Sequence, residues 1–361
     1  MKKSLEIPSR DKRMEVLLKS ARATFGADSI RKLSKDEIIK WPFLSTGLFS
    51  VDNILGIGGL PKGRSTEVFG PEGSGKTTFC LHVVAEAQKK GGIAVYIDAE
   101  HALDLNYAAQ IGVDTDSMLF AQPDSAEQSL DMVEMMAERL TSEDIIVVDS
   151  VAALVPQEEL DASTEKWQMG LQARLMGKGI RKCTGIIAKS GVVTIWVNQL
   201  RAKFGSYGAV ETTPGGNALK FAASVRLDIR RAGKLANAQG QEYGAKIAIK
   251  TLKNKMACPF KKVIVDMIYG EGFSRELSLI NAAIDLEIIE KAGAWYSFEG
   301  EKVQGIEGFR ILMKGNEEIY QKVLESVKIS MKSSKKIIEV EVVEVVDSTK
   351  SLKEGDILCD S

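Results

Sequence analysis

The sequence predicts an α/β fold with a mostly parallel, twisted sheet. From Phe43 to about Gly272, short β-rich runs alternate with helical stretches, which is the pattern of a sheet whose strands are joined by helices. A glycine-rich loop follows one of these runs, and polar side chains follow three others. The chain has 361 residues, enough for about two domains.

Composition excludes several classes of protein. Hydrophobic residues make up 44% of the chain and charged residues 27%, as in a globular protein with a sizeable core. The 48 basic and 49 acidic residues nearly balance, so net charge predicts no nucleic-acid partner but leaves room for a local basic face. The apolar runs are too short to span a membrane, and the N-terminus lacks a secretory signal. The four cysteines and two histidines are too scattered for a disulfide framework or a zinc site, so we expect a reduced, cytoplasmic compartment.

Residues 1–40 form a basic N-terminal segment, with eleven Lys or Arg against six Asp or Glu. Its apolar positions predict an amphipathic helix that closes near Phe25 and Gly26. Such a helix either packs on its own domain or docks on a neighbouring subunit, and the residues alone leave both open.

Four strands are predicted most clearly, and each is followed by residues capable of chemistry. They are Thr66–Phe69, Ile93–Ile97, Ile145–Val148 and Val192–Val197. The residues that follow them are the glycine loop, Asp98 with Glu100, Asp149 with Ser150, and Asn198 with Gln199. Open parallel sheets bind ligands beyond the carboxyl ends of their strands. We therefore expect these four groups to converge on one crevice.

The segment GPEGSGKT at 70–77 fits the P-loop pattern and follows a strand, as the motif requires. Its backbone N–H groups, at the start of a helix, would cradle phosphates. Lys76 would add a charge toward the β and γ phosphates, and Thr77 a hydroxyl for Mg²⁺. A glycine-rich turn with a chance lysine would lack both the strand before it and the helix after it.

Three further side chains belong to this prediction. Asp149 ends an apolar strand, as the magnesium-binding carboxylate of a P-loop enzyme does. Glu100 could activate the attacking water, or it could cap the following helix together with His101. Gln199 could sense the γ-phosphate through its amide, although a buried glutamine or one in a turn would look the same.

Two polar stretches interrupt the core and predict functional loops, at 157–168 and 201–217. The second contains four glycines. Farther on, Lys253 and Lys255 are predicted to lie on a short turn after a strand. They are either solvated surface lysines or a pair that reaches a phosphate across a subunit interface.

The C-terminal part predicts a small helical domain and a tail. From Arg275 to about Ser330 the segment is helical and charged, with the aromatic segment AWYSFEG as a loop between helices. Residues 337–361 contain seven acidic and two basic residues and are expected to form a tail. The run IIEVEVVEVV within it alternates like a strand, which a disordered acidic tail would not normally do.

These residues resemble the bacterial RecA recombinases over roughly 5–330. The resemblance rests on long segments: STGLFSVDNILGIGGLPKGR, EVFGPEGSGKTT, YIDAEHALD, VVDSVAALVP, ETTPGGNALKFAASVRLDIRR, KNKMACPFK and IEKAGAWYS. It implies a RecA-type ATPase core over 41–274 with DNA-binding loops near 157–168 and 200–216. It also implies an N-terminal polymerisation helix and strand over 1–40, a small α+β C-terminal domain over 275–331, and a partly disordered tail over 332–361.

The resemblance implies a DNA-dependent ATPase that forms a helical filament on single-stranded DNA, pairs it with homologous double-stranded DNA and promotes strand exchange. Its implied cofactors are ATP and Mg²⁺, and no membrane partner is expected. It leaves open whether the protein also promotes the self-cleavage of a repressor of the SOS response to DNA damage.

The resemblance also implies roles at the nucleotide site. Glu100 matches the catalytic glutamate, Lys76 the P-loop lysine, and Gln199 the glutamine that couples ATP to the DNA loops. Thr77 and Asp149 match the Mg²⁺ positions. The nucleotide-binding positions are Gly70, Pro71, Glu72, Gly73, Ser74, Gly75, Lys76, Thr77, Thr78, Asp104, Tyr107 and Tyr269.

Further roles implied by the resemblance concern DNA and subunit contacts. Lys253 and Lys255 match lysines that contact ATP bound in the adjacent subunit. Phe221 and residues 1–40 match intersubunit contacts. The DNA-binding positions are Met169, Gly170, Arg174, Arg181, Arg201, Gly215, Gly216 and Asn217.

The chain departs from the family pattern in its two loops. The first contains Lys166 and Trp167 in place of smaller or acidic residues, and Trp167 either packs under the loop or stacks on a base. The second is one residue short, with Phe204 and Tyr207 as its aromatics. Two competing hypotheses are a ring-shaped P-loop helicase and a nucleotide-binding protein that has lost its ATPase activity.

Overall fold

The computed structural model describes residues 8–27, 29–32, 41–162, 170–202, 211–237 and 239–331. The chain divides into two compact units, residues 1–40 and 41–361. The first contains α1 (Arg10–Phe25), which ends at Gly26 as predicted and buries none of its own residues. Among the described residues no helix is long and apolar enough to cross a membrane.

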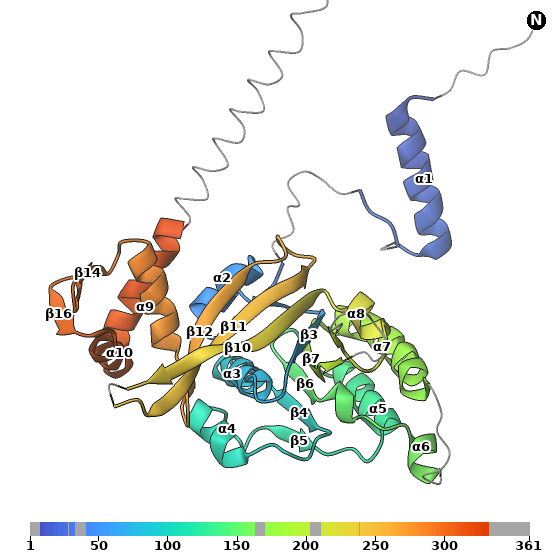
Figure 1. Cartoon of the computed structure of the whole chain (residues 1–361). Coiled ribbons are helices and arrows are strands. Elements are labelled where there is room, and N and C mark those ends of the chain that lie inside the picture. Colours follow the sequence, from blue (N-terminus) through green and yellow to red (C-terminus); the bar gives the residue numbers. More distant parts are fainter. Residues whose placement is uncertain are drawn as a thin grey trace, which may run out of the picture. The chain divides into compact units, whose positions relative to one another are not determined.

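The second unit is built on a nine-stranded sheet within the described residues (Figure 1). The strands from β10 to β5 are parallel neighbours, whereas β11, β12 and β13 extend the sheet with antiparallel pairing. The predicted mostly parallel sheet is therefore confirmed. In spatial order the strands are β13 (Gly272–Phe273), β12 (Lys262–Ile268), β11 (Glu242–Asn254), β10 (Val225–Ala236), β3 (Ser65–Gly70), β7 (Val193–Gln199), β6 (Ile145–Asp149), β4 (Ala94–Asp98) and β5 (Leu119–Ala121).

Helices cover both faces of the parallel part of the sheet. One core cluster packs α3 (Lys76–Lys89) and α4 (Leu105–Ile111) on one face, and a second packs α5 (Ala126–Ala137) and α7 (Leu171–Ser190) on the other. Burial on both faces explains why β6 reads as a continuous apolar run, IIVV, before its terminal carboxylate. Smaller elements before the P-loop are β1 (Phe43–Leu44), α2 (Phe49–Leu55) and β2 (Leu60–Pro61).

The two predicted loops contain more regular structure than we expected. After a short 3-10 helix, η1 (Val151–Ala153), the first begins with α6 (Gln157–Asp161). The second begins with β8 (Arg201–Ala202), which pairs with β9 (Glu211–Thr212) before α8 (Ala218–Ala222). Residues 163–169 and 203–210, which include Lys166, Trp167, Phe204 and Tyr207, lie outside the described residues.

The small C-terminal part is α+β, as predicted. Its own hydrophobic cluster is formed by helices and a three-stranded antiparallel sheet. The prediction of an aromatic loop was wrong, because Trp295–Phe298 form the central strand of this sheet and Tyr296 and Phe298 are buried in the cluster. The elements are α9 (Arg275–Asp285), β14 (Glu290–Ala292), β15 (Trp295–Phe298), β16 (Glu301–Gln304), α10 (Ile306–Gly315) and a helix over 317–331.

Candidate active site

The strand order brings the four predicted groups to one edge of the sheet. β3, β7, β6 and β4 are adjacent and parallel, so their carboxyl ends lie along one edge. Register pairs Gly70 with Gln199 and Asp98 with Asp149. The side chains that follow these strands therefore meet within hydrogen-bonding distance, as described below.

The P-loop has the backbone that its glycines require. Gly73 and Gly75 have φ values of 65° and 92°, in the left-handed region where a side chain is strained. At Gly70 a Cβ would lie 2.0 Å from the carbonyl oxygen of Ile229, so only glycine fits beside β10. The loop ends at Gly75, and α3 begins at Lys76, so the free backbone N–H groups of the first helical turn lie next to the P-loop.

The P-loop contains two buried polar side chains, those of Lys76 and Ser74. The Lys76 ammonium donates to the carbonyl oxygen of Pro71 over 2.8 Å and is buried. Burial lowers the pKa of Lys76, while the carboxylates of Asp149 and Glu100 act in the opposite direction. The hydroxyl of Ser74 is also buried and has no hydrogen-bond partner within the described residues. An anion in the loop would satisfy both groups.

Asp149 lies at the end of β6 and accepts two hydrogen bonds on one oxygen. Thr77 Oγ1 donates to Asp149 Oδ2 over 2.7 Å, and the hydroxyl of Tyr96 donates to the same atom over 2.8 Å. Burial raises the pKa of Asp149, and these two bonds act against the rise. Sequence reasoning missed Tyr96, because an aromatic residue in an apolar strand looks like ordinary core.

The oxygen atoms of Thr77 and Asp149 suit a hard divalent cation. Mg²⁺ prefers oxygen ligands and is usually held by one or two carboxylates together with phosphate oxygens. The hydroxyl and the carboxylate lie side by side at the start of α3, where a nucleotide phosphate would sit. The residues present therefore fit the predicted cation.

Glu100 is exposed and is held by its neighbours along the edge of the sheet. Its Oε1 accepts from Gln199 Nε2 over 2.7 Å and from the hydroxyl of Ser150. The alternative that Glu100 caps the next helix was wrong. Asp104 is the N-cap of α4 and accepts from the backbone N–H groups of Asn106 and Tyr107. The Glu100 carboxylate is therefore held at the sheet edge by Ser150 and Gln199, and not at the start of α4.

The positions matched to adenine contacts lie on separate elements. Tyr107, on α4, shares a hydrogen bond of 3.2 Å with the hydroxyl of Thr78 on α3. Tyr269 is 48% exposed and donates to Glu242 Oε1 over 2.6 Å, while its hydroxyl accepts from Arg231. Tyr107 therefore contacts the helix that begins at the P-loop, whereas the Tyr269 hydroxyl is bonded to the hairpin formed by β10 and β11.

Two glycines at the end of the second loop, predicted to contact DNA, pack against the residues that flank the first loop. Gly215 and Gly216 have φ values of 80° and 74°. A Cβ on Gly215 would lie 2.9 Å from Val151 Cγ1, and one on Gly216 would lie 2.9 Å from Ala173 Cβ on α7. Asn217 immediately precedes α8. The end of the second loop is therefore packed against η1 and α7, on either side of the first loop, at positions where a side chain would clash.

The remaining predicted DNA contacts are arranged along α7 and β8. Gly170 is the left-handed N-cap of α7, and Arg174 and Arg181 are exposed on that helix. Arg201 is exposed at the start of β8. Met169 lies outside the described residues.

Lys253 lies within β11, so its predicted position on a turn was wrong. Its ammonium donates to the carbonyl oxygens of Lys220 and Phe221 over 2.8 and 2.9 Å. Burial, with the nearby Lys255 and Arg226, lowers the pKa of Lys253. Phe221 itself is 73% exposed on α8, and Lys255 is exposed just beyond β11. The two lysines are thus not equivalent, because only Lys253 fastens the backbone of α8.

A buried polar cluster under the second loop was also missed by sequence reasoning. Asn198 Nδ2 donates to Glu67 Oε1 and to the carbonyl oxygen of Pro214, each over 3.2 Å. Glu67 is fully buried and pairs with Arg226 at 2.5 Å. The signal in the sequence was a glutamate inside the apolar strand TEVF, which required a buried partner.

Family models and curated proteins identify what this chain resembles. The RecA N-terminal domain model matches residues 12–274, and the RecA C-terminal domain model matches residues 277–332. The chain belongs to the RecA family. Protein RecA of Chloroherpeton thalassium is 51% identical over 323 residues, which cover 89% of this chain and 90% of that protein. Protein RecA 2 of Myxococcus xanthus is 50% identical over 314 residues, covering 86% and 87%.

A solved structure shares the RecA fold at low sequence identity. The RadB recombinase matches with a TM-score of 0.50 and 20% identity, covering 64% of this chain and 98% of that one. As a RecA family member, the chain is a DNA-dependent ATPase of homologous recombination and DNA repair that promotes strand exchange. The family assignment sets aside the hypothesis of a ring-shaped helicase.

Proposed function

We propose that this RecA family protein binds ATP and Mg²⁺ at the edge formed by β3, β7, β6 and β4, and couples hydrolysis to DNA held by its two loops. The observation that carries the proposal is the hydrogen bond of 2.7 Å between Gln199 Nε2 and Glu100 Oε1. It joins the carboxylate proposed to act on water to the last residue of the strand that leads into the second loop.

In the proposed reaction the P-loop holds the triphosphate. Its backbone N–H groups and the Ser74 hydroxyl donate to phosphate oxygens, and Lys76 exchanges the carbonyl of Pro71 for the β and γ phosphates. Thr77 and Asp149 would hold Mg²⁺, which when bound neutralises charge on the phosphates. Asp104 and Tyr107, at the start of α4, would form one side of the proposed adenine site. Tyr269 would form the other side.

Glu100 is proposed as the general base. An exposed carboxylate can accept a proton from a water molecule aligned with the γ-phosphate. Ser150 and Gln199 donate to one oxygen of Glu100, and the other accepts no hydrogen bond from the part of the chain that the structure describes, so it can accept from that water. Gln199 would exchange its bond to Glu100 for one to the γ-phosphate, so that its position reports whether ATP is intact.

The proposed partners are single-stranded DNA, homologous double-stranded DNA and further copies of this chain in a helical filament. Arg174, Arg181 and Arg201 supply exposed charge for phosphates, and the glycines of the second loop permit close approach of the backbone. Lys253 and Lys255 are proposed to reach ATP in the adjacent subunit, with Phe221 and residues 1–40 as subunit contacts. We propose the core as 41–274, the C-terminal domain as 275–331, and the cytoplasm as the location, since the DNA partners lie there.

The decisive experiment measures ATP hydrolysis at fixed salt with no DNA, with long single-stranded DNA and with short oligonucleotides. We expect stimulation by long DNA that fades with short DNA, because an ATP site shared between subunits needs several neighbours on one strand. Lys76→Ala should hydrolyse at background under all three conditions. Hydrolysis by the unaltered chain that is indifferent to DNA would overturn the proposed coupling.

A further inference from the structure

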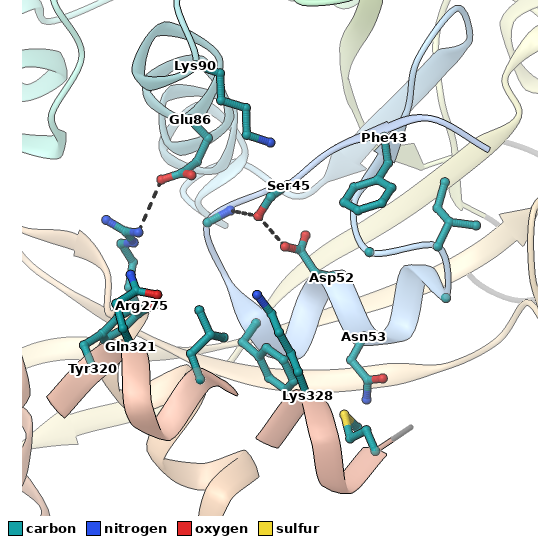
Figure 2. Close-up of a pocket in the computed structure, with 17 residues that line it drawn as sticks. Phe43, Ser45, Asp52, Asn53, Glu86, Lys90, Arg275, Tyr320, Gln321 and Lys328 are labelled. Carbon is teal, nitrogen blue, oxygen red and sulfur yellow. Dashed lines mark hydrogen bonds and ion pairs between the residues drawn. The ribbon is translucent and has the colours of Figure 1, made fainter. Parts of the chain in front are cut away.

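A pocket of about 560 Å³ lies between the ATPase core and the C-terminal helices (Figure 2). One wall comes from residues 43–58 around α2, a second from the C-terminal end of α3, and a third from the helix over 317–331. This volume is within the range of ligand-binding sites. None of the residues assigned above to ATP, Mg²⁺ or DNA lines the pocket.

The floor of the pocket is apolar. Phe49, Leu324 and Met331 are half-buried, and Tyr320 is nearly buried beside them. Phe43 is 41% exposed at the opposite side. Covering such a surface is favourable by about 25 cal/mol for each Å² of apolar area removed from water. The pocket therefore favours an occupant with an apolar face.

The two acidic groups of the pocket are already satisfied by their neighbours. Glu86 accepts from Lys89 Nζ over 2.9 Å and pairs with Arg275 at 3.5 Å (Figure 2). Asp52 accepts from the hydroxyl of Ser45 and from both the backbone N–H and the hydroxyl of Thr46. Burial raises the pKa of Asp52 to about 7, which reduces its negative charge at neutral pH.

Two cations of the pocket remain available for an occupant. Lys90 and Lys328 are exposed, and neither forms an ion pair within the described residues. Figure 2 shows Lys328 extending from the C-terminal helix toward the wall that carries Asp52, with Lys90 on the wall formed by α3. An occupant of this pocket should therefore be acidic as well as apolar.

The sequence beyond the last described residue has both properties. Met331 lines the pocket, and the chain continues through residues 332–361. Within that segment, residues 337–346 read IIEVEVVEVV. In an extended backbone Ile338, Val340 and Val342 lie on one face, and Glu339 and Glu341 on the other. The five residues between 331 and 337 reach about 17 Å when extended, enough for the chain to turn back over its own helix.

We propose that residues 337–346 bind in this pocket of their own chain. Their apolar face covers Phe49, Tyr320 and Leu324, and the carboxylates of Glu339 and Glu341 lie beside Lys90 and Lys328. Bound in this way, the segment fastens the C-terminal helices to the ATPase core.

Photo-cross-linking in the full chain tests the proposal. Benzoylphenylalanine replaces Leu324 in the pocket or, as the matched control, Glu325, which is exposed on the same helix and does not line the pocket. Irradiation of an equal mixture of ¹⁴N and ¹⁵N chains, followed by mass spectrometry, shows which peptides are joined. We expect position 324, and not 325, to join to 337–346 within chains of one isotope. Mixed-isotope products, equal yields at both positions or no tail peptide would overturn the proposal.

Reversing charges in the same assay tests the proposed pairing of Lys328 with Glu339 and Glu341. Lys328→Glu should lower the yield at position 324 about tenfold, because an attractive pair at the rim becomes repulsive. Adding Glu339→Lys and Glu341→Lys to that variant should restore the yield. Lys322→Glu, on the same helix but paired with Glu318 and Glu299, should leave it unchanged. Loss without restoration would refute the pairing, while retained DNA-stimulated ATP hydrolysis in all variants would show that the ATP proposal is unaffected.

Discussion

Gln199 Nε2 donates to Glu100 Oε1 across 2.7 Å, although β7, which ends at Gln199, and β4, which ends two residues before Glu100, are not neighbours in the sheet. β6 lies between β7 and β4, and Ser150, which follows β6, donates to the same oxygen. One carboxylate oxygen therefore connects the ends of three strands. A displacement of any of these three strand ends would therefore move a hydrogen-bond partner of Glu100, the side chain proposed as the base.

Glu100→Gln should reduce DNA-stimulated ATP turnover by about 10²–10⁴-fold, because a neutral amide cannot accept the proton of the attacking water. Binding of ATP and of single-stranded DNA should remain, since the P-loop and the loops are unaltered. Steady-state hydrolysis and a filter-binding assay measure the two effects. Glu138→Gln, an exposed change at the end of α5, serves as the control. Normal turnover by the Glu100 variant would reject Glu100 as the base.

Gln199→Ala should separate ATP hydrolysis without DNA from its stimulation by DNA. We expect hydrolysis without DNA to persist, because Glu100 keeps its bond from Ser150, while the stimulation by long single-stranded DNA is lost. The ratio of rates with and without DNA is the quantity to measure. If that ratio stays at the level of the unaltered chain, Gln199 does not connect the nucleotide to the second loop.

Tyr96→Phe should weaken the proposed Mg²⁺ site and leave the residues proposed to bind the phosphates unchanged. Removing a buried donor to a charged group costs about 1.5–3 kcal/mol, and it removes one of the bonds that hold down the pKa of Asp149. The pKa of Asp149 should therefore rise further, so that the acidic limb of the rate–pH profile shifts to higher pH and more Mg²⁺ is needed for half-maximal rate. Tyr107→Phe, which loses only the bond to Thr78, should leave the Mg²⁺ requirement unchanged.

Phe221→Ala should abolish ordered filaments while leaving the fold intact. The ring is 73% exposed in the single chain, so the free energy of unfolding should change by less than about 0.5 kcal/mol. Electron microscopy on single-stranded DNA and urea unfolding measure the two quantities. Phe260→Ala is a matched control, because its ring is 67% exposed. Intact filaments in the Phe221 variant would contradict its assignment as a subunit contact.

His82 should make the protein less stable as the pH falls below about 6.5. Its Nε2 accepts from the backbone N–H of Phe273 over 2.8 Å, and burial lowers its pKa to about 3, so the folded state holds the neutral ring. The unfolded chain binds a proton below its ordinary pKa, and stability then decreases by up to about 1.4 kcal/mol per pH unit down to the folded pKa. Above pH 6.5 this contribution is fully present.

Urea unfolding between pH 7 and 5 tests this dependence. His82→Gln keeps an acceptor that does not titrate, so it should flatten the decrease relative to the unaltered chain. His101→Gln, at the exposed second histidine of the sequence, is the matched control variant. Identical slopes in all three proteins would show that the pKa of His82 is not depressed.

Features marked by local pattern were predictable from the sequence. The strands, the end of α1 at Gly26 and the groups at the sheet edge follow from periodicity, glycine and the rule that parallel strands present ligands at their carboxyl ends. Tyr96 was missed because its role depends on Asp149, which is 53 residues away and is brought close only by the pairing of β4 with β6. Lys253 was placed on a turn because the lysines obscured the alternation of β11, whose pairing with β10 overrides local propensity.

The second loop starts within two residues of the proposed nucleotide site. Gln199 is the last residue of β7, and Leu200 alone separates it from β8, whose first residue is Arg201. Each peptide unit is planar and stiff, so only a few backbone dihedral angles lie between Gln199 and the hairpin of β8 and β9. A rotation of the backbone at Gln199 is therefore passed on to that hairpin. Under the proposed function, loss of the γ-phosphate would therefore rotate the second loop and its DNA contacts, without a change in the rest of the domain.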